Sequence, residues 1–239
     1  MEALRLGPRL EAVASFVPPD ACAADIGTDH GLLPVWLRLN GRAKRVIASD
    51  IRPGPLSAAQ RNAERYLADG ISFRLCAGLS GVSPEEVDTV VIAGMGGETM
   101  ISILQEADWD WSGKRLILEA NTRYPELLTW IYAHGLHVCG EKLAEERGRL
   151  YRICCIVSGQ RELPGKAFLW GGAEDSAYAR RQSQLLAAAA AGLRKSTSQK
   201  DRARLQEYIS VLEEMDHAYH WGNTAGALLS GASGKENGL

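Results

Sequence analysis

The fold is decided by one stretch of sequence, Ala24-Asp25-Ile26-Gly27-Thr28-Asp29-His30-Gly31. It completes an apolar run at residues 22–26 and precedes an amphipathic run at residues 32–39. Glycines in this stretch allow a tight turn, because glycine adopts backbone angles that other residues avoid. A strand that enters a helix through a glycine turn is typical of the first unit of a parallel sheet.

The alternation of strand and helix continues through the first 160 residues. Further strands are predicted at residues 45–49, 71–75, 87–93, 114–118, 136–141 and 150–157. Helices are predicted at residues 55–68, 98–105 and 124–134. The last two strands have no long helix between them and should form an antiparallel hairpin. The sequence therefore predicts an α/β fold with a seven-stranded, mostly parallel sheet covered on both faces.

The length of 239 residues corresponds to about 1.6 domains at roughly 150 residues per domain. The composition changes after Gly159: residues 160–172 have the character of a linker, and residues 173–219 lack strand patterns. Five alanines at 187–191 favour a helix, and Gly192 with the serines at 196 and 198 predicts a break before a second helix. We expect domains at 1–160 and 161–221, the second a helical hairpin or coiled coil, and a disordered tail at 222–239.

The first loop carries acids where a phosphate-binding loop needs bare backbone. Asp29 takes the place of the second glycine of a dinucleotide-binding loop, and Asp25 lies in the strand before it. Two carboxylates oppose a pyrophosphate but suit a cationic cofactor. S-adenosylmethionine carries a sulfonium and an ammonium group, and Asp50 would accept hydrogen bonds from its ribose hydroxyls. The alternative is that Asp25 and Asp50 only cap turns.

The fourth predicted strand ends in Ala93-Gly94-Met95-Gly96-Gly97, which leaves backbone groups exposed toward the cofactor. Methyltransferases that modify exocyclic amines usually carry an Asn/Asp-Pro-Pro-aromatic box here, and this chain lacks it. An exocyclic amine acceptor is therefore disfavoured, whereas a ring nitrogen is not. The alternative is that the glycines form only a tight strand-to-helix turn.

These segments resemble the TrmK-type bacterial tRNA methyltransferases, which methylate N1 of adenine 22 in tRNA with S-adenosylmethionine. The resemblance rests on Asp25 to Gly31 with Leu33-Pro34, on Gly54-Pro55-Leu56 and on Ala93 to Gly97. It covers about residues 6–156, and the C-terminal helical hairpin also matches the family. It implies a Rossmann-like class I S-adenosylmethionine-dependent methyltransferase domain over residues 1–160.

Two turns differ from the family pattern. The third-strand turn usually reads Gly-Asp-Gly-Leu, and here Ala77 replaces the acid that faces the cofactor's adenine. The fifth strand usually ends in Gln-Pro-Asn or Gln-Pro-Met-Thr, and here it reads Glu119-Ala120-Asn121-Thr122. These differences leave two alternatives to a tRNA methyltransferase: a non-catalytic RNA-binding relative and a small-molecule methyltransferase.

The resemblance and the loop chemistry together assign the site. Asp29 is the catalytic candidate, because it could accept a hydrogen bond from the adenine amino group and stabilise the charge that develops on the methylated ring. Met95 would offer apolar surface to the base. His30 could contact the base or a phosphate. The alternative is that it is a histidine at a helix start whose hydrogen bonds are made to the backbone. The expected cofactor-binding residues are Asp25, Gly27, Thr28, His30, Asp50, Ile51, Ala77, Gly78, Ala93 and Gly94.

The net charge of −2 argues against a uniformly basic surface but conceals clustering. Between residues 180 and 204, seven basic side chains face only Asp201, a local charge of +6. Phosphate contacts scale with such charges, so we expect tRNA to bind there; the alternative is a solvated hairpin tip. The expected tRNA-binding residues are Arg180, Arg181, Arg194, Lys195, Lys200, Arg202 and Arg204, with Arg5 and Arg9 on an N-terminal helix.

The cysteines and the hydropathy pattern suggest the compartment. Five cysteines without a C-x-x-C motif indicate neither a disulfide framework nor a zinc site. Apolar runs stay below the ~18 residues that span a bilayer, and the N-terminal residues lack a signal-peptide core. We expect a cytoplasmic monomer whose partner is tRNA, with no metal and no membrane association.

Overall fold

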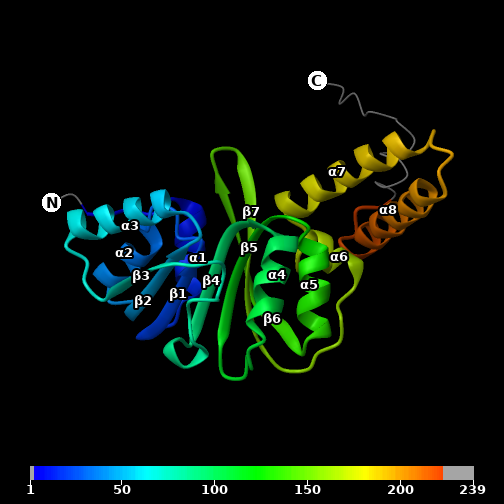
Figure 1. Ribbon diagram of the computed structural model, residues 1–239. Helices are drawn as coiled ribbons and strands as arrows, with labels where there is room; N and C mark the ends of the chain where they lie inside the picture. Colours follow the sequence, from blue (N-terminus) through cyan, green and yellow to red (C-terminus); the bar gives the residue numbers. More distant parts are fainter. Residues whose placement is uncertain (1–2, 223–239) are drawn as a thin grey trace, which may run out of the picture. The chain divides into compact units, whose positions relative to one another are not determined.

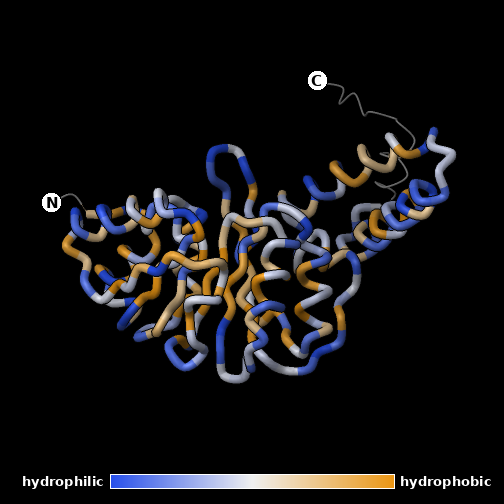
Figure 2. The backbone as a smooth tube through the Cα atoms, viewed as in Figure 1, coloured by the Kyte–Doolittle hydropathy of each residue, from blue (hydrophilic) through white to orange (hydrophobic). Residues whose placement is uncertain are grey.

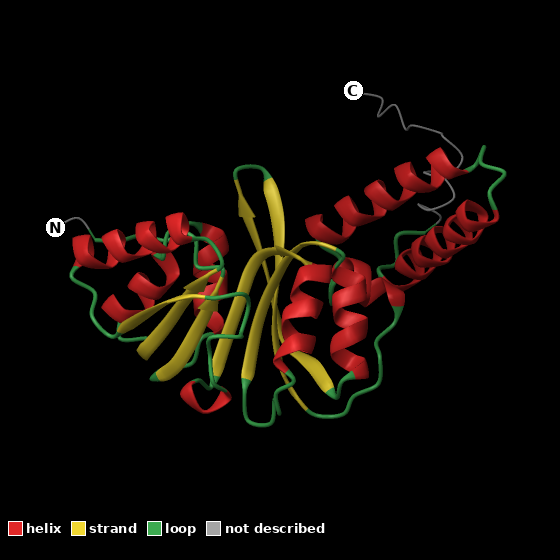
Figure 3. Ribbon diagram, in the orientation of Figure 1, coloured by secondary structure: helices red, strands yellow, loops and turns green. Residues whose placement is uncertain are grey.

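Residues 3–222 are described here from a computed structural model, in which the chain forms two compact units, Met1–Leu163 and Pro164–Leu239 (Figure 1). The first unit contains the sheet, and the described part of the second contains helices and connecting loops without strands (Figure 3). Of the tail predicted at residues 222–239, all but Gly222 lies outside the described residues.

One sheet of seven strands organises the first unit, in the order β3-β2-β1-β4-β5-β7-β6. The strands are β1 (Ala21–Ile26), β2 (Ala43–Asp50), β3 (Ile71–Leu75), β4 (Thr89–Gly96), β5 (Arg115–Thr122), β6 (Leu136–Glu146) and β7 (Arg149–Ser158). The first five are parallel, whereas β7 is antiparallel to both β5 and β6. The predicted fold class is confirmed. The strand order reverses between β1 and β4, which is where open α/β sheets form ligand crevices.

The hairpin of β6 and β7 is longer than its apolar pattern suggested. Its pairing continues to Glu146 and Arg149, beyond the predicted end at residue 141. An exposed two-stranded ribbon needs main-chain pairing but no apolar face, so hydropathy alone underestimated its length. Figure 1 shows the hairpin extending past the rest of the sheet.

Helices cover both faces of the sheet. They are α1 (Pro8–Phe16), α2 (Leu32–Leu39), α3 (Pro53–Tyr66), α4 (Gly97–Ala107) and α5 (Tyr124–Ala133), with a short 3-10 turn, η1 (Pro84–Glu86). The expectation that Arg5 lies on the N-terminal helix is wrong. The helix begins at Pro8, because proline fits the first helical turn, where its missing N–H is not needed. Arg5 lies in the irregular segment before it.

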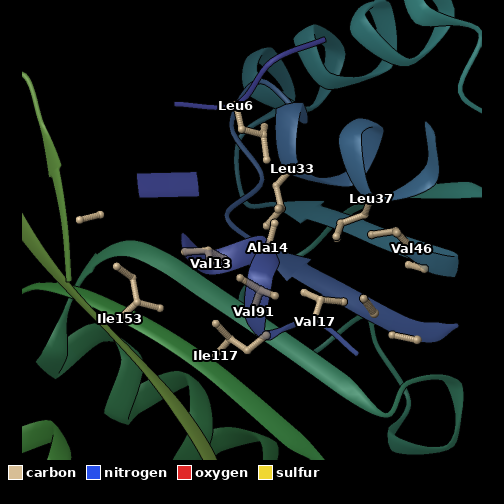
Figure 4. Packing of buried hydrophobic residues seen from close by; sticks show 14 residues of the cluster. Leu6, Val13, Ala14, Val17, Leu33, Leu37, Val46, Val91, Ile117 and Ile153 are labelled. Carbon is tan, nitrogen blue, oxygen red and sulfur yellow. The ribbon is translucent and has the colours of Figure 1, made fainter. Parts of the chain in front are cut away.

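The core explains why the central strands are apolar throughout. Val91 and Ile117 pack in one cluster with Val13 of α1 (Figure 4). Their neighbours along β4, Val90 and Ile92, face the opposite side and are also fully buried. Alternate residues of one strand therefore meet helices on both faces, as in other parallel sheets. Figure 2 shows these strands as hydrophobic.

The second unit has its own core. Its helices are α6 (Lys166–Gly171), α7 (Ala177–Leu193) and α8 (Gln199–Ala218), and the two predicted helices are α7 and α8. Leu186 packs with Leu212 and Met215. The interpretation of residues 160–172 as a linker is wrong for α6. Tertiary contacts stabilise this short helix, since Glu214 accepts a hydrogen bond from the Ala167 N–H at 3.0 Å.

Candidate functional site

A cavity of about 630 Å³ opens at the carboxyl ends of β1, β2 and β4. It lies where the strand order reverses, as expected for an α/β fold. The fold brings together every residue predicted to bind the cofactor or to act in catalysis. The lining includes Asp25, Gly27, Thr28, Asp29, His30, Asp50, Ile51, Ala77, Gly78, Ala93, Gly94 and Met95.

The first loop is fixed by backbone contacts to the end of β2. The Gly27 and Thr28 N–H groups both donate to the Ser49 carbonyl oxygen, each at 2.8 Å. Gly27 has a φ of 77°, and the Met95 methyl group occupies the space that a Cβ there would need. Glycine is therefore favoured by the backbone conformation of the turn, and a larger residue would also displace the Met95 side chain.

The floor of the cavity is acidic and buried. Asp25 is 7% exposed and Asp50 is 5% exposed. Burial raises the pKa of Asp25 to about 6, against the opposing influence of the Thr28 hydroxyl and the Arg9 charge. Asp50 Oδ1 accepts a hydrogen bond from the Arg52 N–H at 2.8 Å. A buried carboxyl with a raised pKa is stabilised in its charged form when a cation comes close.

The hydroxyl group of Ser49 indicates what kind of cofactor would fit the floor of the cavity. Its hydroxyl is buried in the cavity wall without a hydrogen-bond partner among the described residues. Buried polar groups without partners are rare in proteins, so this hydroxyl indicates that a ligand or water binds there. The floor combines two buried acids with an unpaired hydroxyl, which suits a cofactor that carries positive charge and hydroxyl groups.

Asp29 and His30 lie at the mouth of the cavity and differ from the buried acids. Their side chains are 63% and 64% exposed, and Asp29 Oδ2 lies 3.7 Å from His30 Nε2. Asp29 adopts a φ of 49°, a strained backbone angle for a residue with a side chain. Strain of this kind is common at functional sites. The exposed carboxylate is available to a substrate that enters from solvent.

The end of β4 forms the opposite wall. Gly94 has a φ of 82°, and its carbonyl oxygen accepts a hydrogen bond from Asn121 Nδ2 at 2.8 Å. Pairing between β4 and β5 shifts register on both sides of Met95. Gly97 packs directly against the backbone of Arg123, which leaves no room for a side chain. Gly94 thus lines the cavity, whereas Gly97 serves the close packing of the strand-to-helix turn.

One pair of site residues went unrecognised in the sequence. Arg9 lines the cavity, and its guanidinium donates to Glu119 Oε2 at 2.8 Å. Glu119 is 1% exposed, and burial raises its pKa while Arg9 opposes that shift. Arg9 also lies 5.5 Å from the centre of the Tyr151 ring. The signal in the sequence was a glutamate directly after the apolar run Leu116-Ile117-Leu118. Arg9, expected to bind tRNA, is located in the cavity wall.

The other residues predicted to bind tRNA are exposed. Arg5 lies in the first unit, and seven lie on or between α7 and α8. Arg180 pairs with Asp175 at 2.6 Å, and Arg204 lies 5.7 Å from the centre of the Tyr208 ring. The remaining five are Arg181, Arg194, Lys195, Lys200 and Arg202, all exposed.

Residues 3–222 contain no cluster of three or more His, Cys, Asp or Glu side chains that could hold a metal ion. Over the same residues, no helix combines the length and the apolar character needed to cross a bilayer.

Comparisons with known proteins agree with the geometry. Residues 6–154 match the family model described as a methyltransferase domain. The chain is 37% identical over 164 residues to the tRNA (adenine(22)-N(1))-methyltransferase of Bacillus subtilis, covering 68% of this chain and 69% of that protein.

Solved structures show the same similarity. The crystal structure of the B. subtilis m1A22 tRNA methyltransferase TrmK matches with a TM-score of 0.82 at 28% identity, over 90% of this chain and 99% of that one. The crystal structure of Streptococcus pneumoniae Sp1610 in complex with S-adenosyl-L-methionine matches with a TM-score of 0.76 at 32% identity, over 87% of this chain and all of that one.

Proposed function

Since this chain belongs to the tRNA (adenine(22)-N(1))-methyltransferase family, we propose that it transfers a methyl group from S-adenosylmethionine to N1 of adenine 22 in tRNA. The observation that carries this proposal is the acidic cavity at the reversal of strand order, with Asp25 and Asp50 in its floor. A cationic cofactor would compensate the buried negative charge that the protein alone leaves without full solvation.

The cofactor-binding roles follow from burial. Asp25 would hold positive charge of the cofactor, Asp50 would accept hydrogen bonds from the ribose, and Ser49 would gain a partner. Ile51, 68% exposed at the cavity edge, would pack on the adenine of the cofactor. Ala77 contributes a methyl group without charge, so the adenine is held by packing and main-chain groups at this turn.

When bound, S-adenosylmethionine supplies an electrophilic methyl group on a sulfonium. Adenine N1 has an in-plane lone pair and is neutral near pH 7, so no strong base is required. This chain contributes mainly position and electrostatics. Asp29, exposed at the mouth, would accept a hydrogen bond from the adenine amino group. Its carboxylate would also stabilise the positive charge that the ring gains on methylation.

The wall formed by Gly94 and Met95 would position the acceptor base. Adenine 22 lies inside folded tRNA, so binding requires extrusion of the base, which costs a few kcal/mol. Met95 offers the apolar surface on which an extruded base packs, while Asn121 holds the Gly94 carbonyl in place. Arg9, paired with Glu119, shapes this wall and is a positioning residue rather than a contact to phosphate.

The tRNA itself would also contact the basic side chains of α7 and α8. Seven exposed arginines and lysines lie there, and phosphate contacts supply most sequence-independent affinity for RNA. We propose that the enzyme acts as a monomer and, because its substrate is tRNA, that it works in the cytoplasm.

The deciding experiment incubates the full chain with S-adenosylmethionine and an unmodified tRNA transcript that has adenine at position 22. Nucleoside digestion and mass spectrometry should detect 1-methyladenosine, and a transcript with guanine at position 22 should give none. Absence of 1-methyladenosine from the first transcript would refute the proposal. Calorimetric titration with the cofactor then distinguishes the alternatives. An RNA-binding relative would not bind S-adenosylmethionine, whereas a small-molecule methyltransferase would.

A further inference from the structure

The tip of the β6–β7 hairpin presents arginines on the side of the sheet where the cavity opens. β7 is antiparallel to β5, with Cys154 opposite Leu118. Residues before Cys154 in β7 therefore run past Leu118, the last residue of β5 that pairs with β7, toward the carboxyl end of β5. The turn joins Glu146 to Arg149, so the tip lies beyond the strand ends that form the cavity (Figure 1).

Alternation along β7 determines which side chains face the cavity wall. Ile153 packs in the same core cluster as α1, and Tyr151 lies beside Arg9 of the wall. Arg149 is the next residue on that face, because every second side chain of a strand points the same way. At ~3.3 Å per residue, its Cα lies about 7 Å beyond that of Tyr151. Arg149 is exposed, whereas Tyr151 is half-buried.

The N-terminal segment lies against the same face. Leu6 belongs to the core cluster that includes Ala144 and Ile153 of the hairpin. Glu146 Oε1 occupies the space that a Cβ at Gly7 would need. Arg5 is therefore held close to the hairpin and is exposed. Glu146 itself is directed at Arg9, whose Nε lies 3.9 Å from its carboxylate.

The turn itself has the usual glycine at its second position but an unusual residue, Arg147, at its first. Arg147 and Gly148 have φ values of 51° and 73°, the pattern of a two-residue type I′ turn. Such turns prefer asparagine or aspartate before the glycine, because other side chains are strained at positive φ. Arg147 is exposed at the tip. A strained residue that gains nothing from packing indicates that its side chain is used elsewhere.

We propose that the hairpin tip, defined by Arg147 and Arg149 with Arg5 beside it, is a phosphate-binding surface for the substrate RNA. It would hold the backbone that flanks the extruded adenine and so fix the register of the strand over the cavity. This inference rests on the proposed function, and it adds a substrate contact in the catalytic unit itself, separate from the basic helices α7 and α8. Figure 2 shows the tip as one of the most hydrophilic parts of the unit.

The test uses the full chain and an unmodified tRNA, with binding followed by fluorescence anisotropy at several salt concentrations. Arg147→Asn and Arg149→Gln should each raise the dissociation constant about threefold to tenfold at physiological salt. Each should also reduce the slope of log affinity against log salt by roughly one contact, about 0.7–0.9. The Michaelis constant for tRNA should rise similarly, with kcat at saturating tRNA and affinity for S-adenosylmethionine unchanged.

Arg147→Asn separates function from folding. Asparagine suits the first position of this turn, so the variant should melt at the same temperature as the wild type or higher while it binds tRNA less well. The control is Arg65→Gln, which removes an exposed charge near the end of α3, at the opposite edge of the sheet. It should leave the salt slope unchanged.

Two outcomes would overturn the inference. One is a salt slope and Michaelis constant for both hairpin variants equal to those of the wild type. The other is an equal effect of Arg65→Gln, which would show that net charge rather than the tip matters. Failure of the proposed function looks different, because the wild type would then bind tRNA without forming 1-methyladenosine.

Discussion

Replacing Asp25 with asparagine should stabilise the cofactor-free protein while weakening cofactor binding. Burial raises the pKa of Asp25 from 3.8 to about 6. The folded protein therefore binds this proton more tightly than the unfolded chain, and ionisation of Asp25 opposes folding. The difference of about 2.2 units, at roughly 1.4 kcal/mol per unit, amounts to about 3 kcal/mol at pH 7.5. An asparagine side chain at this position carries no charge and avoids this destabilisation.

The direction of the pKa shift of Asp25 determines how stability depends on pH. Because the folded pKa lies above the unfolded one, the destabilisation is complete above pH 6 and disappears as the pH falls toward 4. At pH 5 it should be about half as large as at pH 7.5. Urea denaturation of the wild type and Asp25→Asn, without cofactor, should thus show a stability difference that shrinks by about half between pH 7.5 and pH 5. Any unsatisfied amide in the variant adds a constant and does not alter this change.

Cofactor binding provides the second measurement. A cation binds best to ionised Asp25, so the affinity of the wild type for S-adenosylmethionine should fall about tenfold per pH unit below pH 6 and stay level above it. Asp25→Asn should bind more weakly at pH 7.5 and lose this dependence. Asp29→Asn is the matched control for stability, because that side chain is 63% exposed. A stability difference for Asp25→Asn that does not change between pH 7.5 and pH 5 would refute the reasoning.

Three further predictions concern the rest of the site. Asp29→Ala should lower kcat at least tenfold with little change in calorimetric cofactor affinity; an unchanged rate would remove Asp29 from the mechanism. Arg9→Met leaves Glu119 buried without its cation, so urea denaturation should show a loss of about 2 kcal/mol or more. The double variant Arg9→Met/Glu119→Leu should recover part of it, and no recovery would contradict the coupling. Gly27→Ala strains a φ of 77° and overlaps the Met95 methyl group, which should lower the free energy of unfolding by about 1–3 kcal/mol. Adding Met95→Ala should relieve the overlap but not the backbone strain, and full restoration of stability would argue against a strained turn.

The sequence predicted the architecture because local patterns encode it. Strands that are buried on both faces appear as continuous apolar runs, and glycines mark the turns after β1 and β4. The acids of the first loop were interpreted as part of a cofactor site because two carboxylates, Asp25 and Asp29, oppose a pyrophosphate, and this interpretation uses only residues that are close in the chain. The structure differs from the prediction where the sequence pattern is weak. An example is the short helix α6, which depends on the contact between Glu214 and Ala167.

The sequence by itself determined the seven strands, the main helices between them and the acidic character of the first loop, since each follows from residues close together in the chain. Only the tertiary structure paired Arg9 with Glu119 across 110 positions. It also decided that Asp25 is buried whereas Asp29 is exposed, and that the β6–β7 register pairs Arg149 with Glu146 at the end of the hairpin. Burial and long-range pairing depend on how helices and strands pack, and no local pattern specifies that.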